Sequence, residues 1–460
     1  MSIFIELLWP FLLRFAAKKN NKETSMATLS PTKARWTNRF SFLMVGIGAS
    51  VGLGNLWRFP FQAGENGGSA FVLVYLLCII GIVYPVLIGE LAVGRHMGLS
   101  AVGSTKEMAR AAGRSPWWGL VGGIGALATY MVLCIYGVIS GRVLAYAVAG
   151  FGGGFIEGSV PEVYATPLRA FLWQTLFMVI TVAIVLRGLH KGLEGFSRIS
   201  MPAFFIMLSL LSVYSIRNGD ASAAIDYLLS PRFEELTPQV MLAAFGQAFF
   251  SVVVGGAAML TFGAYLDKKA NIVNDGLLIA TSDTIVALMA GLMIFPIVFQ
   301  FNLDPAMGMG LIFSTMPHSF LQMPAGSMVG GLFFSLAALG ALTSSIAMLM
   351  LAAVAVEEQL HLQRKTAVLT LGVIAWAVGA VSAFYPHVNE EIDFFSGQVM
   401  MPIGGILIAV FAGWIAPREV MRVELSGLSD MMFSVWQFIV RYMAPLLVGG
   451  VLVLGVSARF

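Results

Sequence analysis

The sequence predicts an all-α integral membrane protein with about eleven transmembrane helices. The first observation is composition: 58% of the residues are hydrophobic and only 11% are charged, whereas soluble domains carry about a quarter charged residues. The second is that the apolar residues form runs of roughly 20, the length that a hydrocarbon core of ~30 Å requires. The third is that no stretch between these runs is long enough to form a soluble domain.

The apolar runs divide the chain into four regions. A cytoplasmic N-terminal segment, 1–39, precedes the first span, and region 416–460 holds the last span and a short C-terminus. Two sets of five spans lie between them, in 40–216 and 217–415, and we expect them to form two inverted repeats. The spans are expected at 42–62, 69–91, 119–149, 168–187, 196–216, 240–265, 276–302, 329–356, 366–386, 394–415 and 432–457.

Lys and Arg residues are concentrated on one side of these spans. They are frequent before the first span and in alternate loops, at 95–114, 187–198, 268–269 and 364–365. Because cytoplasmic loops are enriched in basic residues, we expect a cytoplasmic N-terminus and, with an odd number of spans, a C-terminus outside. The expected location is the inner (plasma) membrane. This bias explains the net charge of +3, so no nucleic-acid partner is expected.

Two spans carry residues that interrupt a helix. The first contains VGIGASVGLGNLWRFP at 45–60, with four glycines, an asparagine, an arginine and a proline. The sixth contains a second Gly-rich stretch near 251–256. Freed backbone groups are tolerated within a bilayer only where they line a cavity or face protein. Two breaks, one opening each set of five spans, indicate a secondary transporter with its site at the membrane midplane. Small residues that simply allow close helix packing are the alternative.

Five segments of the chain share one resemblance. They are GASVGLGNLWRFPFQAGENGGSAF (48–71), LEGFSRISMP (193–202), GQAFFSVVVGG (246–256), ALTSSIAM (341–348) and EEIDFF (390–395). Together they resemble the neurotransmitter:sodium symporter family, in particular its bacterial amino-acid transporters. The resemblance implies sodium-coupled symport of an amino acid by alternating access and no enzyme activity. The sequence alone leaves the oligomeric state open.

Three other functions remain as alternatives. One is a proton-coupled amino-acid transporter of the same architecture, which typically places a cation where the second sodium would lie. The fifth span, FFIMLSLLSVY, carries no Lys or Arg, and this disfavours that interpretation. The others are a substrate sensor that binds without transport, and a channel.

The resemblance implies two sodium ions, bound by hard oxygen ligands from unwound backbone and small polar side chains. The implied ligands of the first site are Ser50, Asn55, Ser251 and Asp283, with the substrate's carboxylate. Those of the second are Gly48, Val51, Gly340, Thr343 and Ser344. Hydroxyls that bond back to their own helix are the alternative for the TSS triplet.

Asp283 is the most informative charged residue inside a span, because intramembrane carboxylates are functional candidates that need a partner. We expect the first sodium to be that partner. Ala287 lies one helical turn later, where animal relatives have a chloride-binding serine. We therefore expect no requirement for chloride. As a secondary expectation, protonation of Asp283 on the empty return step would give proton countertransport.

The substrate residues are also implied by the resemblance. They are Ser50, Leu53, Gly54, Val132, Tyr136, Phe250, Ser251, Val253, Gly256, Ser344 and Met348. The N–H groups of Leu53 and Gly54 and the Tyr136 hydroxyl would bind the carboxylate, as helix N-termini bind anions. The chain departs from the bacterial pattern at three positions: Val253 replaces a serine, Gly256 a bulky aromatic residue and Met348 an isoleucine. The lost ring predicts a hydrophobic or aromatic substrate.

The remaining charged residues suggest two gates. The implied gate residues are Arg58, Phe250 and Asp393 on the outer side, and Lys33 or Arg35 beside Trp36, with Glu357 or Glu358, on the inner side. Exposed ion pairs contribute only about 0–1 kcal/mol, which suits contacts that must open. Glu90 is expected to support the unwound first helix. Arg142 has no assigned role beyond reaching the outer interface, and Cys78 and Cys134 are expected to be buried thiols.

Overall fold

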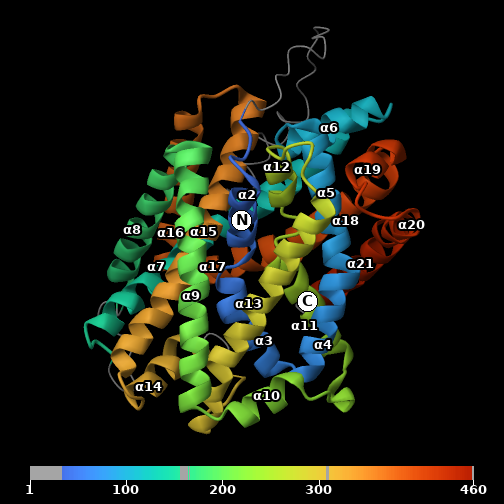
Figure 1. The fold of residues 1–460 in the computed structure, drawn as a ribbon. Helices are drawn as coiled ribbons and strands as arrows, with labels where there is room; N and C mark the ends of the chain where they lie inside the picture. The colour runs from blue at the N-terminus through green and yellow to red at the C-terminus, as the bar shows by residue number, and fades with distance from the viewer. Residues whose placement is uncertain (1–33, 156–163, 165, 307–309, 458–460) are drawn as a thin grey trace.

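The computed structural model describes residues 34–155, 164, 166–306 and 310–457. Within these ranges every regular element is a helix (Figure 1). The helices, in chain order, are α2 (Arg39–Ser50), η1 (Gly54–Arg58), α3 (Phe59–Glu65), α4 (Ser69–Cys78), η2 (Ile79–Val83), α5 (Tyr84–Met97), α6 (Ala101–Ala111), η3 (Pro116–Trp118), α7 (Gly119–Phe151), α8 (Pro167–Leu186), η5 (Leu189–Glu194), α9 (Gly195–Asn218), α10 (Ala221–Leu229), η6 (Phe233–Glu235), α11 (Pro238–Ser251), α12 (Ala258–Gly263), α13 (Ile272–Gln300), η7 (Leu311–Thr315), α14 (Met316–Leu321), α15 (Gly326–Leu360), α16 (Arg364–Phe384), α17 (Pro386–Asp393), η8 (Phe394–Met400), α18 (Met401–Val410), η9 (Phe411–Ile415), α19 (Arg418–Glu424), α20 (Asp430–Phe438), η10 (Ile439–Met443) and α21 (Ala444–Ser457). The all-α prediction is confirmed.

Most of the expected spans are continuous helices. In the described part of the chain, nine helices are long and apolar enough to cross a membrane, and the pair α2 and η1–α3, bent by 49°, makes a tenth. The sixth expected span consists of α11, with 14 residues, and α12, with only 6. Neither is long enough to cross a bilayer alone. The predicted interruptions therefore fall in the first and sixth spans.

The starts of several helices follow from their capping residues. Asn38 precedes α2, and its side-chain oxygen accepts the N–H of Ser41 at 2.8 Å. Thr166 and Thr237 cap α8 and α11 in the same way, each followed by a proline at the start of the helix. Side chains of this kind satisfy N–H groups that have no partner inside the helix, and proline there loses no hydrogen bond. Local sequence thus sets these boundaries.

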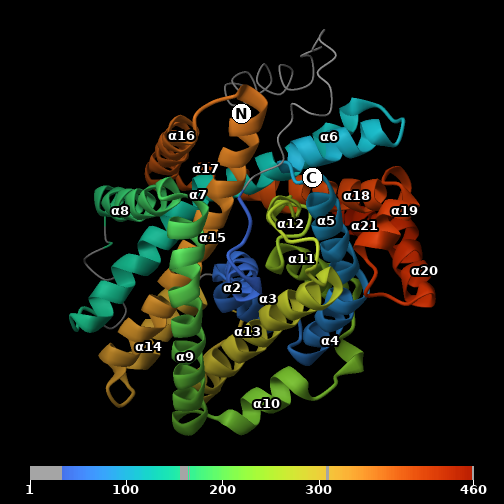
Figure 2. The same cartoon turned by 45° about the horizontal axis from the view of Figure 1, so that its top comes forward.

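The first broken helix lies at the centre of the molecule. Figures 1 and 2 show α2 enclosed by α9, α12, α13 and α15, and residues of all four contact it. Its side chains are buried from Phe42 onward on most faces, including Val45 and Ile47. Because α2 faces protein all round, the groups freed at its end also face protein rather than lipid.

The molecule has two ends that need names. The α6 face carries α6 and α19 and lies at the top of Figure 1, whereas the α10 face carries α10 and α14 and lies at the bottom. On the α6 face, the buried Glu424 carboxylate accepts from Arg95 Nε at 2.6 Å, and it also contacts His96 at 3.1 Å and Lys268 at 3.3 Å. Burial would raise the pKa of Glu424, but these hydrogen bonds and positive charges lower it to about 2. This cluster fastens α19 to α5.

Candidate functional site

The first helix breaks just after α2. Val51 is extended, with φ −74° and ψ 115°, and the chain then turns through Gly52 into η1. A Cβ on Gly52 would lie 2.6 Å from Ser344 Oγ and 3.0 Å from the Tyr136 hydroxyl oxygen, so only glycine fits there. The N–H of Leu53 donates to that tyrosine oxygen at 3.2 Å. The break therefore turns backbone groups toward α7 and α15.

The sixth helix breaks over residues 252–257. Val253, Gly255 and Ala257 all have left-handed backbone conformations, with φ of 56°, 85° and 60°. A β-branched residue such as valine is rarely found there. A Cβ on Gly255 would lie 2.4 Å from the backbone N of Gly405, so the unwound chain packs directly on α18. The second break is thus a tightly held, non-helical segment.

Glu90 supports this second break. Its carboxylate is buried in α5, and Oε1 accepts the N–H of Gly255 at 2.8 Å. The prediction that Glu90 supports the unwound first helix is wrong in this structure, since the hydrogen bond runs to the sixth span. The physical reason is that α5 packs against α12, the continuation of that span.

Polar side chains from four helices, η1, α4, α11 and α13, meet beside the first break. Asp283 of α13 accepts from Asn55 Nδ2 at 2.8 Å and from Ser251 Oγ at 2.6 Å, and the Tyr75 hydroxyl lies 3.4 Å away. All four residues are buried. These donors are neutral, and no cationic side chain of the described residues forms an ion pair with Asp283. The cluster is a buried carboxylate whose charge lacks a fixed counter-charge.

A second group of oxygens lies between α2 and α15. The Ser344 hydroxyl is 3.4 Å from the Gly48 carbonyl, 3.3 Å from that of Val51 and 3.1 Å from that of Gly340. The Thr343 hydroxyl is 2.9 Å from the Gly340 carbonyl. Bonding back to the same helix therefore accounts for Thr343, but Ser344 also reaches across to α2. All five residues predicted for the second ion site converge here.

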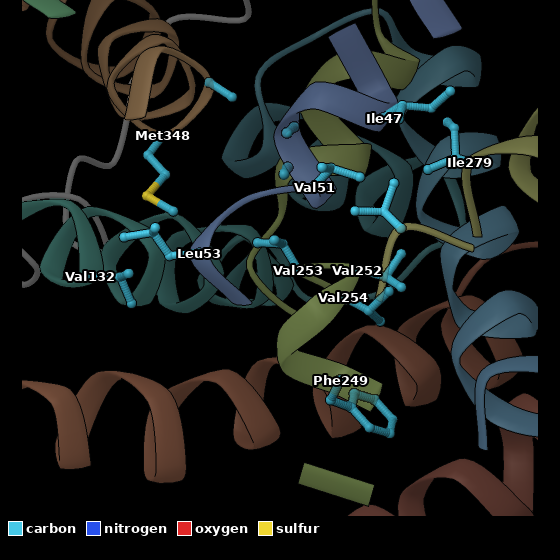
Figure 3. Close-up of a cluster of buried hydrophobic side chains, with 14 of the residues drawn as sticks. Ile47, Val51, Leu53, Val132, Phe249, Val252, Val253, Val254, Ile279 and Met348 are labelled. Atoms are coloured by element: carbon cyan, nitrogen blue, oxygen red, sulfur yellow. The ribbon is translucent and has the colours of Figure 1, made fainter. Parts of the chain in front are cut away.

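A small cavity lies between the two breaks. Its volume is about 30 Å³, room for no more than about two water molecules. Nine of the eleven predicted substrate residues line it: Ser50, Gly54, Val132, Tyr136, Phe250, Ser251, Val253, Ser344 and Met348. Figure 3 shows Val132 on α7, Met348 on α15 and Val253 on the unwound segment, three apolar residues of its wall. An amino acid enters only if these side chains move apart.

Two predicted substrate residues lie outside the cavity lining. The side chain of Leu53 faces an apolar cavity with Leu56 and Val143 instead, although its N–H still bonds Tyr136. Gly256 lies one layer behind the wall, where a Cβ would be 2.5 Å from Thr129 Oγ1 and 3.2 Å from Met401 Cε. The prediction that Gly256 directly faces the substrate is therefore corrected, because these two side chains fill the space.

Four lining residues are absent from the predicted set. They are Ala49, Gly52, Thr129 and Met401. Ala49 and Gly52 lie within the Gly-rich motif at 45–60. Because neighbouring residues of that motif are in the predicted set, the motif could have identified these two as well. Thr129 and Met401 lie on long apolar helices where nothing in the sequence distinguishes a cavity-facing position from a packed one.

Comparison with known proteins decides the family. The model of the "Sodium:neurotransmitter symporter family" matches residues 33–168 and 165–458. The chain belongs to the sodium:neurotransmitter symporter family. It is therefore a multi-pass, sodium-dependent membrane transporter and not an enzyme.

Bacterial relatives match nearly the whole chain. An uncharacterised sodium-dependent transporter of Bacillus subtilis, YhdH, is 33% identical over 437 residues, covering 90% of this chain and 95% of its own. A second, from Haemophilus influenzae, is 29% identical over 450 residues, covering 92% and 98%. The crystal structure of MhsT in complex with L-phenylalanine aligns with a TM-score of 0.83 and 34% identity, over 92% of this chain and 99% of MhsT. The fold of this symporter is thus the fold of MhsT.

One side of the cavity is covered by Phe250 and Arg58. The Arg58 guanidinium lies over the Phe250 ring, 4.1 Å from its centre. Arg58 and Asp393 influence each other electrostatically, but the described structure contains no direct ion pair between them. Beyond Phe250 lies a chamber of about 250 Å³. The ion pair predicted for the outer side of this symporter is thus not formed in the described structure.

The α6 face is closed by different contacts from those predicted. Arg35 pairs with Asp267 at 2.9 Å rather than with Glu357 or Glu358. Glu358 instead accepts from the N–H and hydroxyl of Ser100, both at 2.7 Å, at the start of α6. The predicted pair of Arg35 with Glu357 or Glu358 does not form because the segment around Arg35 runs along the end of the sixth span. Asp267 lies there, shortly after α12. Lys33 lies outside the described residues.

Trp36 makes several contacts on this face. Its indole N–H donates to the Phe262 carbonyl at 3.0 Å, and its backbone N–H donates to the Tyr265 carbonyl at 3.2 Å. The ring also packs against the rings of Phe42, Phe262 and Tyr265, with centres 5.7–5.9 Å apart. The segment before α2 is therefore fixed to the end of the sixth span.

Arg142 does not simply extend to an interface. Its guanidinium lies 4.2 Å from the centre of the Phe313 ring and donates to the Tyr146 hydroxyl at 3.3 Å. The rings of Tyr146 and Tyr164 lie 5.4 and 5.5 Å away. Arg142 thus joins α7 to η7 through aromatic contacts.

Proposed function

We propose that this protein carries a hydrophobic or aromatic amino acid into the cell together with two sodium ions, by alternating access. The observation that supports the proposal most is the convergence of Asn55, Ser251 and Asp283, which come from three different helices, on a buried carboxylate without a fixed cation. Sodium would supply the missing positive charge. The second ion would bind among the carbonyl and hydroxyl oxygens around Ser344.

The substrate would bind between the two breaks. Its carboxylate would accept from the N–H groups of Leu53 and Gly54 and from Tyr136, and would also touch the first sodium, so that ion and substrate stabilise each other. Carbonyls of Ser50 and Ser251 would accept from its amine. Its side chain would lie against Val132, Val253 and Met348. MhsT, which is 34% identical, has been solved with L-phenylalanine, and this supports an apolar side chain.

The orientation in the membrane belongs to the same proposal. The α6 face would be cytoplasmic, because the basic residues of α6 and of the loop before α13 lie there, as cytoplasmic loops require. The C-terminus would lie outside, and residues 40–216 and 217–415 would be the two inverted repeats. The contacts of Trp36 would then help to close the cytoplasmic side in the present conformation.

A proton-coupled transporter is the main alternative. Such a protein typically places a cation at the second ion site. Met201 of α9 occupies that side instead: its Sδ would lie 3.1 Å from a Cβ on Gly48. This favours sodium at the second site.

Uptake into liposomes tests the proposal. The purified protein would be reconstituted, and uptake of labelled phenylalanine, leucine and alanine would be measured under a sodium gradient, a proton gradient or neither. Uptake driven by the sodium gradient alone is expected. Uptake driven by protons without sodium would favour the alternative, and saturable binding without uptake would indicate a sensor.

A further inference from the structure

Two side chains separate the cavity from the larger chamber beyond it. The cavity of about 30 Å³ and the chamber of about 250 Å³ share only Phe250 and Met401 among their described lining residues. The chamber is otherwise lined by residues of η1, α3, α11, η8, α18 and α21. Phe250 and Met401 therefore form the partition between a space too small for an amino acid and one with room to spare.

Phe250 is held in place on two sides. Arg58 stacks on its ring at 4.1 Å. On the other side, the ring lies so close to Gly54 that a Cβ there would be 3.1 Å from Phe250 Cε1. Moving this ring would break a cation–π contact.

Met401 is held only by packing. It is the first residue of α18, directly after the π-helical turn η8, and its side chain is buried. Within the described ranges no hydrogen bond or ion pair fixes the thioether, and methionine has three rotatable side-chain bonds, which let it refill irregular spaces. Met401 Cε lies beside Gly256, and a Cβ on that glycine would be 3.2 Å from it. The methionine thus occupies the room that the absent ring at position 256 leaves.

The other wall beside Gly256 cannot yield in the same way. Thr129 Oγ1 donates to the Gly256 carbonyl at 2.7 Å, so moving Thr129 would leave a buried acceptor unpaired, which is unfavourable. Val253 is fixed by the backbone of the unwound segment. Of the groups around Gly256, only Met401 can move at low cost, and the chamber provides the space.

We propose that Met401 determines which amino-acid side chains this transporter accepts. The proposal rests on the proposed function of the same cavity. The Met401 side chain fills the end of the cavity when the substrate is small, and turns toward the chamber when a large apolar or aromatic side chain enters. Position 401 therefore sets the upper size limit of the substrate, with Gly256 providing the room behind it.

Substitutions at two adjacent methionines test this. Met401→Ala enlarges the cavity, Met401→Phe fills it, and Met400→Ala is the matched control, because Met400 lines neither space. Sodium-driven uptake of labelled alanine, leucine and tryptophan would be measured for each variant as kcat/KM. We expect Met401→Ala to raise the tryptophan-to-alanine ratio about tenfold or more and Met401→Phe to lower it as much, since one methylene of fit is worth about 10–200-fold.

The outcomes separate the two proposals. Ratios in both Met401 variants equal to that of Met400→Ala would overturn the role of Met401 while leaving the proposed function intact. Absence of sodium-driven uptake of any amino acid in the unsubstituted protein would overturn the proposed function and the specificity role with it. If Met401→Ala does not fold, the volume-conserving Met401→Leu, expected to keep the ratio near that of the unsubstituted protein, and Met401→Phe carry the test.

Discussion

Two buried carboxylates of this protein have opposite surroundings. Glu424, on the α6 face, contacts Arg95, His96 and Lys268 within 2.6–3.3 Å. Asp283, near the centre of the bundle, contacts only the neutral donors of Asn55, Ser251 and Tyr75 among the described residues. Both side chains are nearly inaccessible to water.

The difference separates a charge pair within the chain from the proposed site of a mobile ion. Burying a charge is unfavourable unless it is paired. Glu424 has its partners within the chain, so its pair holds α19 and α5 together at all times. Neutral donors stabilise the Asp283 carboxylate but leave its charge uncompensated, so a cation that arrives from solution gains the full interaction. A carboxylate with fixed cations could not bind and release sodium in this way.

Asp283→Asn is expected to have the largest effect. The amide has the same shape but no charge, so sodium-driven uptake should fall to background. The rise in unfolding temperature that sodium produces should also become smaller, because only the proposed second ion site could still bind the ion and stabilise the fold. Stability in sodium-free detergent should be unchanged or higher. If sodium raised the unfolding temperature of Asp283→Asn as much as that of the unsubstituted protein, the proposal that Asp283 binds sodium would be contradicted.

Glu424→Gln should show the reverse pattern. It leaves Arg95 buried without a counter-charge, which should lower the free energy of unfolding by about 3–5 kcal/mol, measured by denaturant titration in detergent. The sodium concentration for half-maximal uptake should not change. Glu419→Gln, at an exposed position of the same helix, is the matched control. A change in sodium affinity without loss of stability would contradict the assignment.

The pH dependence of stability sharpens the contrast further. The pKa of Glu424 is lowered from 4.5 to about 2, so its contribution is complete above pH 4.5 and is lost as the pH falls toward 2. The difference in unfolding free energy between the unsubstituted protein and Glu424→Gln should shrink over this range, by up to about 3 kcal/mol. A difference that stays constant from pH 7 to pH 3 would contradict the charge pairing.

Ser344→Ala tests the proposed second ion site, which contains no charged side chain. Removing the hydroxyl that joins the carbonyls of α2 and α15 should weaken sodium binding by about 1–3 kcal/mol, which raises the half-saturating sodium concentration about 5–150-fold. Ser345→Ala is the control, because the adjacent Ser345 hydroxyl is buried and has no hydrogen-bond partner in the described structure. Thr343→Ala should act like Ser344→Ala. Equal sodium affinities in all three variants would contradict the assignment of the second ion site.

Removal of chloride is expected to have no effect on uptake. If Asp283 supplies the negative charge that balances sodium, replacing chloride by gluconate at constant sodium should leave uptake unchanged. The absence of a hydroxyl at Ala287 supports this expectation. A loss greater than about tenfold, or 1.4 kcal/mol, would mean that the carboxylate does not suffice.

The sequence predicts the two breaks and singles out polar residues beside them, since glycines and polar groups inside apolar spans are unfavourable unless they line a cavity or bind a ligand. Asn55, Ser251 and Asp283 do meet in space, although 228 residues separate the first from the last. Met401 and Thr129 could not be found in this way, because a methionine or threonine on an apolar helix looks the same whether it faces a cavity or a neighbour.

Contacts between elements were also harder to predict. The partner of Glu90 depends on how α5 packs against α12, and that of Arg35 on where the chain runs after α12. Both are fixed by tertiary packing rather than by local sequence. The predicted partners of Glu90 and Arg35 were therefore wrong, whereas the predicted break in the first span was confirmed.

The left-handed conformation of Val253 has an energetic consequence. A β-branched residue with φ of 56° raises the free energy of the unwound segment by about 1–3 kcal/mol. The segment stays in this shape only while packing against its neighbours, such as that of Gly255 against α18, offsets the strain. If the proposed substrate binds against Val253, which lines the cavity, relaxation of this strained segment would be coupled to release of the substrate.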